Sequence, residues 1–518
     1  MLLSRLCGAL VLFCGALSGA CAQPVNHLPD SLSTLPQVID DALTTFNTPG
    51  MAVGIVVDGK PIYAAGHGLR DVEQDLPVNT TTWFRLASTS KAFTGLAMAQ
   101  LVSEGKLSWN DKVVDHLPEF ALSDPWVTRE FRIRDLFIHQ SGLAGAAGDL
   151  MLWPAPSTFT IREIIHNLRY LQPVHSFRTR FAYSNVMYLV AGEIIARKRQ
   201  STYAETLQDH VFSKLDMQCY GSGVDDAVLN NAAVSYSYNS QTGFTAVARN
   251  QISAGPVNYD AAGAVTCNLD SMLKWLAFWE DDTQQLVSKK QKQWLVRQQV
   301  ALPVSDLDEA WNDTQFSGYA IGWRVGDING CKVVSHTGTV SGYQTYVAFI
   351  PSLKVAAVIM NNGSHYGARG AVMQTILKHY LAPDEQRNWV ASFKGFADDR
   401  DKRWNKRHHP ATGSGDTGRP ADAYTGTYVD VAMGKMTITQ REDGLYIASE
   451  KMPALTGKLT ALDKDAFSVA WDKGVESPVI LTFADNSHHA VDRFTVSPFI
   501  LPADKHHAWK DFLFKKYN

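Results

Sequence analysis

The segment RLASTSKAFTG, residues 85–95, places a serine and a lysine three positions apart among small and apolar residues. On a helix, positions three apart share a face, so the amine of Lys91 can reach the hydroxyl of Ser88. Burial lowers the pKa of a lysine because its charged form is desolvated, and a neutral amine can accept the proton of a serine nucleophile. The pair therefore predicts nucleophilic catalysis by Ser88 with Lys91 as its base.

Two other Ser-x-x-Lys matches show that the pattern alone is weak. The match at 103–106 is interrupted by Gly105 at a predicted helix end, and the match at 271–274 reads as a helix start with a solvated lysine. Neither has small and apolar residues on both sides. Only the match at 88–91 has the surroundings that this chemistry needs.

A second polar group comes from RFAYSNVMYLVAGEII, residues 180–195, where Tyr183 and Asn185 stand at the start of a predicted helix. A tyrosine near a lysine can ionise more easily, or relay a proton to a leaving group. Taken alone, the pattern favours a helix cap beside a core tyrosine. Its meaning depends on the other motifs.

A third group is His336-Thr337-Gly338, which lies in the predicted strand of VVSHTGTVSGY. The glycine would let a substrate backbone lie close beside the strand. A similar triplet at 365–367 does not lie on a predicted strand, which favours the first.

The elements that must position these groups predict an α/β layer fold closed by antiparallel strands. Asp58-Gly59 marks a hairpin within 50–70, and a helix is predicted to begin near Lys91 and end at Gly105. Further predicted elements are listed in chain order: mainly helix over 160–200, strands over 332–338, 343–351 and 354–362, and a helix over 368–379.

The chain divides into four predicted parts. Residues 1–22 form a signal peptide and residues 23–390 the catalytic domain. Residues 391–420 are charged, then rich in Gly, Pro and Ser, which indicates a linker. Residues 421–518 contain short alternating strands at intervals of about ten residues, which predict a small all-β barrel or sandwich.

In this order the three motifs closely resemble those of the serine β-lactamase and penicillin-binding protein superfamily. The Tyr-x-Asn form is similar to the class C-like branch (peptidase S12 type), which includes D-aminopeptidases, esterases and D-Ala-D-Ala carboxypeptidases. The resemblance covers about residues 35–385. Besides the motifs it includes IRDLFIHQSGL (133–143), YDAAGAVTCNLDSMLKWL (259–276) and YAIGW (319–323).

The resemblance implies a β-lactamase-like transpeptidase fold and a role for each matching residue. Ser88 would be the nucleophile, Lys91 its base and Tyr183 a partner in proton transfer, while Asn185 would bind the substrate amide. The backbone N–H groups of Ser88 and Thr339 would form an oxyanion hole.

One departure concerns the third motif, where His336 stands in place of the family's lysine. That lysine helps to hold a substrate carboxylate, whereas a histidine with an ordinary pKa near 6.5 is mostly neutral at pH 7. This departure makes efficient β-lactam hydrolysis a weaker expectation than hydrolysis of amides or esters. Arg369 has two interpretations, a second carboxylate contact as in class C enzymes or a solvent-facing helix residue.

The start of the chain is typical of an exported protein. An early arginine, an apolar stretch of about a dozen residues and Ala20-Cys21-Ala22 predict a signal peptide cleaved after Ala22 and a periplasmic or secreted product. Lipid anchoring through Cys21 is the alternative, although Leu17 stands one place too early for it. No later segment is apolar enough to span a membrane.

The remaining cysteines are Cys219, Cys267 and Cys331. They are interpreted as buried thiols, and whether two of them form a disulfide is left undecided. The 518 residues carry a net charge of −3, which gives no basic field for nucleic acid. The histidine pairs at 408–409, 488–489 and 506–507 match no metal spacing. No metal and no organic cofactor are predicted.

The sequence thus predicts an exported serine hydrolase with an acyl-enzyme mechanism. Its substrate would be a small molecule or short peptide, an amide or ester, with D-amino-acid and cell-wall peptides among the candidates. The alternatives are a penicillin-binding DD-carboxypeptidase or class C β-lactamase and, in another class, a sensor that is acylated without turnover. The C-terminal strands resemble a lipocalin-like domain, which could shape the cleft, mediate self-assembly or bind an apolar ligand.

Overall fold

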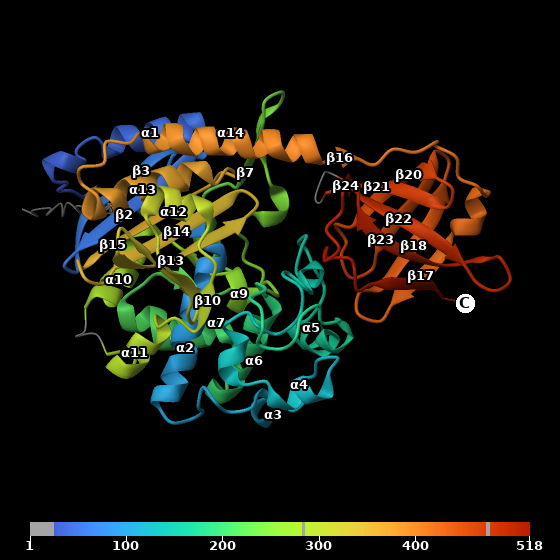
Figure 1. Cartoon of the computed structure of the whole chain (residues 1–518), viewed down its shortest axis with the longest axis horizontal. Helices are drawn as coiled ribbons and strands as arrows, with labels where there is room; N and C mark the ends of the chain where they lie inside the picture. Colours follow the sequence, from blue (N-terminus) through green and yellow to red (C-terminus); the bar gives the residue numbers. More distant parts are fainter. Residues whose placement is uncertain (1–24, 282–284, 473–476, 518) are drawn as a thin grey trace, which may run out of the picture.

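The computed structural model describes residues 25–281, 285–472 and 477–517 (Figure 1). The predicted signal peptide, with its cleavage site and Cys21, lies outside these ranges. Within them, none of the helices has the length and apolar character needed to cross a membrane. A large sheet covered by helices forms the first part of the chain, and a β-barrel forms the last part.

The large sheet is antiparallel throughout and confirms the predicted fold class. Residues of distant segments meet in it, because the N-terminal hairpin pairs with a strand that follows the third motif. Its main strand order is β1 (Val25–Asn26), β3 (Lys60–Asp71), β2 (Gly50–Val57), β15 (Val355–Asn361), β14 (Tyr343–Ile350), β13 (Cys331–Val340), β12 (Arg324–Ile328), β11 (Ser317–Tyr319) and β10 (Val300–Leu302), with β4 (Leu76–Pro77) beside β3.

Helices cover both faces of this sheet, as Figure 1 shows. On one face, α1 (Leu35–Thr45), α13 (Gly367–Leu381) and α14 (Trp389–Arg407) bury an apolar cluster against the strands. On the other face lie α10 (Leu269–Glu280), α2 (Lys91–Ser103), α6 (Val186–Arg199) and the shorter helices around them. The candidate catalytic residues lie between this second layer and the sheet. The region predicted as mainly helical, 160–200, contains α5 (Ile161–Asn167) and α6 with an irregular stretch between them.

The C-terminal strands close into an eight-stranded barrel, which confirms the predicted all-β domain. Its strands are β17 (Gly426–Asp430), β18 (Gly434–Arg441), β19 (Gly444–Ser449), β20 (Thr456–Asp463), β21 (Ala466–Trp471), β22 (Val479–Asp485), β23 (Val491–Pro498) and β25 (Leu513–Lys516). Aromatic rings fill the interior: Tyr424, Tyr428, Phe494 and Phe514 are fully buried. This packing weighs against an apolar ligand in the barrel's centre.

The first part of the segment predicted as a linker, 391–420, is helical. Helix α14 continues to Arg407, and its buried positions Trp389 and Ala397 lie two helical turns apart. Trp311 of the catalytic region packs edge-on against Trp389 and Phe393. The apolar positions occur at the start of the helix, so the charged second half alone carries no helical pattern.

The barrel is attached to the catalytic region by specific contacts as well as by the chain. Lys451, in the turn between β19 and β20, forms an ion pair with Glu163 at 2.6 Å, and its carbonyl oxygen accepts a hydrogen bond from the backbone N–H of Thr158 at 2.9 Å. Asn167 Nδ2 donates to the carbonyl oxygen of Ala432 at 2.8 Å. These contacts join the barrel to the segment that follows residue 149.

Candidate active site

Ser88 lies on η2 (Ala87–Ser90), a single 3₁₀ turn immediately before α2. All residues from 82 to 101 are buried except Ser88, which is partly exposed. The preceding Ala87 has φ 48°, a left-handed conformation that is strained for a residue with a side chain. The local backbone therefore holds one hydroxyl at the surface of an otherwise closed core.

Lys91 is the first residue of α2 and is completely buried. Because a 3₁₀ turn has three residues per turn, residues three apart lie directly above one another. The amine Nζ lies 3.3 Å from Ser88 Oγ, 2.7 Å from Asn185 Oδ1 and 2.7 Å from the carbonyl oxygen of Ala262. Burial lowers the pKa of Lys91 to about 7, and the Asp149 carboxylate opposes this shift.

Two of these three contacts fix the direction of the amine. The oxygens of Asn185 and Ala262 can only accept, so each takes an N–H of Lys91. When the amine is neutral, its two N–H groups are used in this way and its lone pair is left for the Ser88 hydroxyl. The geometry suits proton transfer from Ser88 to Lys91.

Tyr183 lies beside the same pair. Lys91 Nζ is 4.9 Å from the centre of its ring, and Tyr183 Oη is buried without a hydrogen-bond partner in the described part of the chain. Burial raises the pKa of Tyr183 well above its usual value, while its interaction with the Ser88 hydroxyl acts in the opposite direction. The phenol is therefore protonated at neutral pH.

Asn185 is the residue before the first turn of α6, and both ends of its side-chain amide are engaged. Its Oδ1 accepts from Lys91, and its Nδ2 donates to Asp149 Oδ2 at 2.7 Å. Asp149 was not predicted from the sequence. It lies in GAAGDLMLWP, which has no helical or strand period, so only the fold brings its carboxylate to this site.

His336 is buried, and both of its ring nitrogens have partners. Nδ1 lies 2.7 Å from the carbonyl oxygen of Thr337, which can only accept, so Nδ1 carries the proton. Nε2 lies 3.0 Å from Tyr319 Oη and therefore accepts from that hydroxyl. Burial and the nearby charge of Arg324 lower the pKa of His336 to about 3. The imidazole is neutral, as its unperturbed pKa also indicated.

The remaining residues of the third motif face different sides of β13. Alternation along the strand puts His336 and Gly338 on the side of Lys91, while Thr337 lies on the opposite side with α13. There Thr337 lines a cavity of about 330 Å³ together with Arg324 and Arg369. Thr339 is exposed, and the oxyanion-hole role of its backbone N–H stays a prediction.

Gly338 has a structural role that the sequence did not predict. A Cβ at this position would lie 2.0 Å from the carbonyl oxygen of Leu86 and 3.2 Å from the Cβ of Ala87. The glycine thus makes room for the segment that carries Ser88, and the close approach of a substrate backbone to this strand stays a prediction.

Only 8% of Arg369 is exposed, so the interpretation of this arginine as a solvent-facing helix residue is wrong. From α13 its Nη1 donates to the carbonyl oxygens of Gly338 and Thr345, which belong to β13 and β14. Burial lowers its pKa to about 10. Arg369 therefore ties the two strands together from behind; a contact with a substrate carboxylate stays a prediction.

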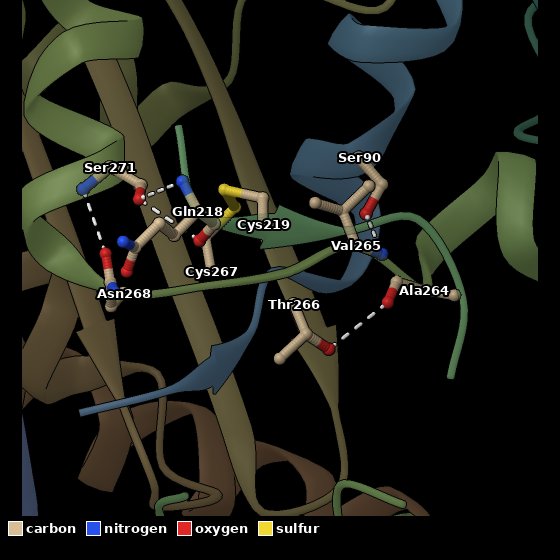
Figure 2. Close-up of a disulfide and its surroundings, with 9 residues drawn as sticks. All are labelled: Ser90, Gln218, Cys219, Ala264, Val265, Thr266, Cys267, Asn268 and Ser271. Atoms are coloured by element: carbon tan, nitrogen blue, oxygen red, sulfur yellow. Dashed lines mark hydrogen bonds between the residues drawn. A yellow bond between two sulfur atoms is a disulfide. The ribbon is translucent and has the colours of Figure 1, made fainter. Parts of the chain in front are cut away.

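A disulfide lies close to the segment that carries Ser88 (Figure 2). Cys219 and Cys267 are bonded, which answers the question the sequence left open, and Cys331 is free. Cys267 belongs to β9 (Thr266–Cys267), which pairs with both β5 (Phe84–Arg85) and β6 (Cys219–Tyr220).

The residue before β9, Val265, is bonded to the turn that carries Ser88. Its carbonyl oxygen accepts from the N–H of Leu86 at 2.8 Å. Its N–H donates to Ser90 Oγ at 3.1 Å, a bond drawn in Figure 2. The disulfide therefore anchors the short strand that holds the nucleophile turn.

The two other Ser-x-x-Lys matches are not catalytic pairs. Lys106 forms an ion pair with Glu104, and Lys274 forms one with Asp216. Ser271 Oγ is instead bonded to the backbone of Gln218. The side chains of these two lysines are 46% and 43% exposed, whereas Lys91 is completely buried.

Comparison with known proteins agrees with this geometry. Residues 35–381 match the family model described as "Beta-lactamase", which is more than half of the chain. The chain belongs to the beta-lactamase family. Residues 414–514, which contain the barrel, match a second model, described as "Domain of unknown function (DUF3471)".

Some curated proteins that are similar to this chain are named as hydrolases. Unguisins hydrolase ungD' of Aspergillus campestris is 26% identical over 441 residues, covering 81% of this chain and 80% of the relative. Protein flp of Staphylococcus aureus (strain MW2) is 24% identical over 344 residues, covering 64% of this chain and 63% of flp.

Two solved structures share the fold. An octameric penicillin-binding protein homologue from Pyrococcus abyssi has a TM-score of 0.60 at 20% identity, covering 94% of this chain and all of that chain. A class C beta lactamase from Rhodobacter sphaeroides has a TM-score of 0.55 at 20% identity, covering 68% of this chain and all of that chain. These two structures show the fold that the chain shares with them, and the match of residues 35–381 to the family model shows the family.

Proposed function

We propose that this member of the family is an exported serine hydrolase that acylates Ser88 with peptide-like amides or esters. The observation that carries the proposal is the completely buried Lys91 amine, held 3.3 Å from Ser88 Oγ by two fixed acceptors. A buried amine with a pKa of about 7 is a base at physiological pH.

The reaction follows from the protonation states. Ser88 Oγ attacks the substrate carbonyl carbon as its proton passes to the neutral Lys91 amine. The bond to the leaving nitrogen or oxygen then breaks, and the proton returns to that atom through Tyr183, whose raised pKa keeps it a proton donor. Water attacks the acyl-Ser88 ester and releases the acid.

The edge of β13 supports binding of an extended substrate. Strand β12 pairs with β13 only as far as Ser335. The backbone of residues 336–340 therefore has no paired strand on that edge within the described residues, and a substrate backbone can bond there. The neutral His336 provides no charge for a carboxylate, which favours neutral amides and esters over β-lactams.

Export is part of the proposal. A disulfide between buried cysteines forms in oxidising compartments and is uncommon in the cytosol. This supports the periplasmic or secreted location that the N-terminal pattern predicts.

The test is hydrolysis of p-nitrophenyl esters and of D- and L-amino-acid amides by the mature protein. Ser88→Ala should abolish turnover, and Lys91→Met should lower kcat/KM by about 10²- to 10⁴-fold. Ser103→Ala and Ser271→Ala are matched controls and should retain activity. Full activity of Ser88→Ala would refute the proposal. Two further measurements separate the alternatives. A lasting adduct in intact-mass spectra would indicate a sensor, and turnover of nitrocefin would indicate a β-lactamase.

A further inference from the structure

The Lys91 amine is connected to a carboxylate that takes no part in the steps above. Asp149 begins η4 (Asp149–Met151), and its Oδ2 accepts from Asn185 Nδ2 at 2.7 Å. Asn185 Oδ1 in turn accepts from Lys91 Nζ at 2.7 Å. Two hydrogen bonds through one amide therefore join the carboxylate to the amine.

This arrangement determines which way the Asn185 amide faces. A carboxylate oxygen can only accept, so it selects the NH₂ end of the amide. The amide oxygen must then point towards Lys91. Without Asp149, the amide could turn and present its NH₂ group to the amine, which would repel the N–H groups of Lys91 and release it from Ser88.

The carboxylate also acts through its charge. Its other oxygen, Oδ1, is buried and has no hydrogen-bond partner among the described residues. A charge enclosed in this way is weakly screened, so it acts on Lys91 over a longer range than a surface carboxylate would. Burial raises the pKa of Asp149 to about 7, against the opposing effects of Asn185 and Lys91.

The other groups around Lys91 are neutral near pH 7. The tyrosines have raised pKa values and the histidines lowered ones, because all are buried: Tyr183 and Tyr188 of the α6 region, Tyr319 at the end of β11, His139, and His336 of β13. Arg324, on β12, acts on Tyr183 and on both histidines, Lys91 itself acts on both histidines, and Arg369 acts on His336. Asp149 is the anion that opposes the loss of charge on Lys91.

The segment that carries Asp149 is fixed at several points. The N–H of Ala146 donates to the carbonyl oxygen of Tyr183 at 2.8 Å, which ties the segment to the second motif. Ser157 Oγ donates to the carbonyl oxygen of Met151 at 2.6 Å. Beyond it, Asn167 contacts Met151 Sδ at 3.7 Å and also bonds to Ala432 of the barrel. The carboxylate therefore sits on a supported backbone.

We propose that Asp149 is a positioning residue of this site: through Asn185 it holds the Lys91 amine beside Ser88, and its charge sets the pH at which that amine takes up a proton. The proposal rests on the proposed serine-hydrolase function for its kinetic consequences. The coupling of the two charges is a property of the folded protein and can be measured without a substrate.

Two variants separate orientation from charge. Asp149→Asn keeps an acceptor for Asn185 and removes the charge, so the acidic limb of the kcat/KM profile should move about one pH unit lower, because Lys91 loses its stabilising anion. Asp149→Ala removes the acceptor as well and should also lower the plateau kcat by about 10- to 100-fold. Asp260→Asn is the matched control, since burial also raises the pKa of Asp260 to about 7 but its Oδ1 bonds to the N–H of Ala261. Its acidic limb should stay in place.

The second measurement is an NMR titration with pH of protein that carries ¹³C at the ε-carbon of its lysines. The Lys91 resonance is identified as the one that is absent from the spectrum of Lys91→Arg. The resonance should titrate about one unit lower in Asp149→Asn than in the wild type. An unmoved resonance in a folded Asp149→Asn protein, or an unchanged plateau kcat in Asp149→Ala, would overturn the proposal. If the wild type neither turns over nor acylates, the proposed function fails, and the titration still decides whether Asp149 and Lys91 are coupled.

Discussion

Gly338 of β13 lies directly against the carbonyl group of Leu86, two residues before the candidate nucleophile. The contact joins the strand at the back of the site to the turn that presents Ser88. Any side chain at position 338 would occupy the place of the Leu86 carbonyl oxygen, since its Cβ would approach to 2.0 Å. The backbone of Leu86 has little room to retreat, because its N–H is bonded to Val265.

Gly338→Ala should therefore displace the Ser88 turn. Overpacking of this kind costs about 1–3 kcal/mol of stability, and a shift of about 1 Å in a nucleophile can cost about 100-fold in rate. The expected result is a folded protein with a lower melting temperature and a kcat that falls far more than its stability. Gly395→Ala, on α14, is the control, because a Cβ there meets no atom within 4 Å. Wild-type kcat in Gly338→Ala would contradict the role given to this glycine.

The pH dependence of activity should follow Lys91. Below a pH of about 7 the amine is protonated and cannot accept the Ser88 proton, so kcat/KM should fall as the pH decreases through that value. Because Lys91 and Asp149 interact, the measured midpoint belongs to the pair. Tyr183 should add no alkaline limb near neutrality, since burial keeps its pKa well above 10. A profile of initial rates between pH 5 and 9 tests this; a rate that is flat across that range would argue against Lys91 as the base.

The sequence predicted the parts of the site that depend on local geometry. Ser88 and Lys91 are three residues apart, so one turn of backbone brings them together whatever the rest of the chain does. Tyr183, Asn185 and His336 come from distant segments, and only the resemblance to a family related them to Ser88. Their positions in the fold now support that relation, although their catalytic roles remain proposals.

What the sequence could not predict depends on tertiary contacts. Asp149 lies in a segment without periodicity, and its carboxylate reaches Asn185 only because the loop folds back onto α6. The reason for Gly338 lies 252 positions earlier in the chain, at Leu86, so a strand pattern could not show it. In the same way, the buried start of α14 depends on Trp311, which packs against Trp389 from another segment.

His336→Lys should change substrate preference. The neutral imidazole accepts from the Tyr319 hydroxyl, whereas a lysine would place a cation on the side of β13 that faces Ser88. A charge-assisted hydrogen bond contributes about 1.5–3 kcal/mol, so the kcat/KM ratio of a carboxylate-bearing ester to its neutral analogue should rise by about tenfold or more. His365→Lys serves as the control, because His365 lies after β15 and its ring stacks on Phe46 and Tyr366. An unchanged ratio in a folded His336→Lys protein would show that position 336 does not face the substrate.

Loss of the disulfide should affect the nucleophile as well as stability. The bond between Cys219 and Cys267 spans 48 residues, and a cross-link of this length stabilises a folded protein by about 3–4 kcal/mol. The double variant Cys219→Ala/Cys267→Ala should melt at a lower temperature. It should also lose kcat well below that melting temperature, because β9 then holds Leu86 and Ser90 less firmly through Val265. Cys331→Ala is the control, since this free cysteine lies at the start of β13 and should change neither value. If the double variant lost stability but kept full kcat at temperatures where it is folded, the disulfide would support the fold alone and the strand would hold the turn without it.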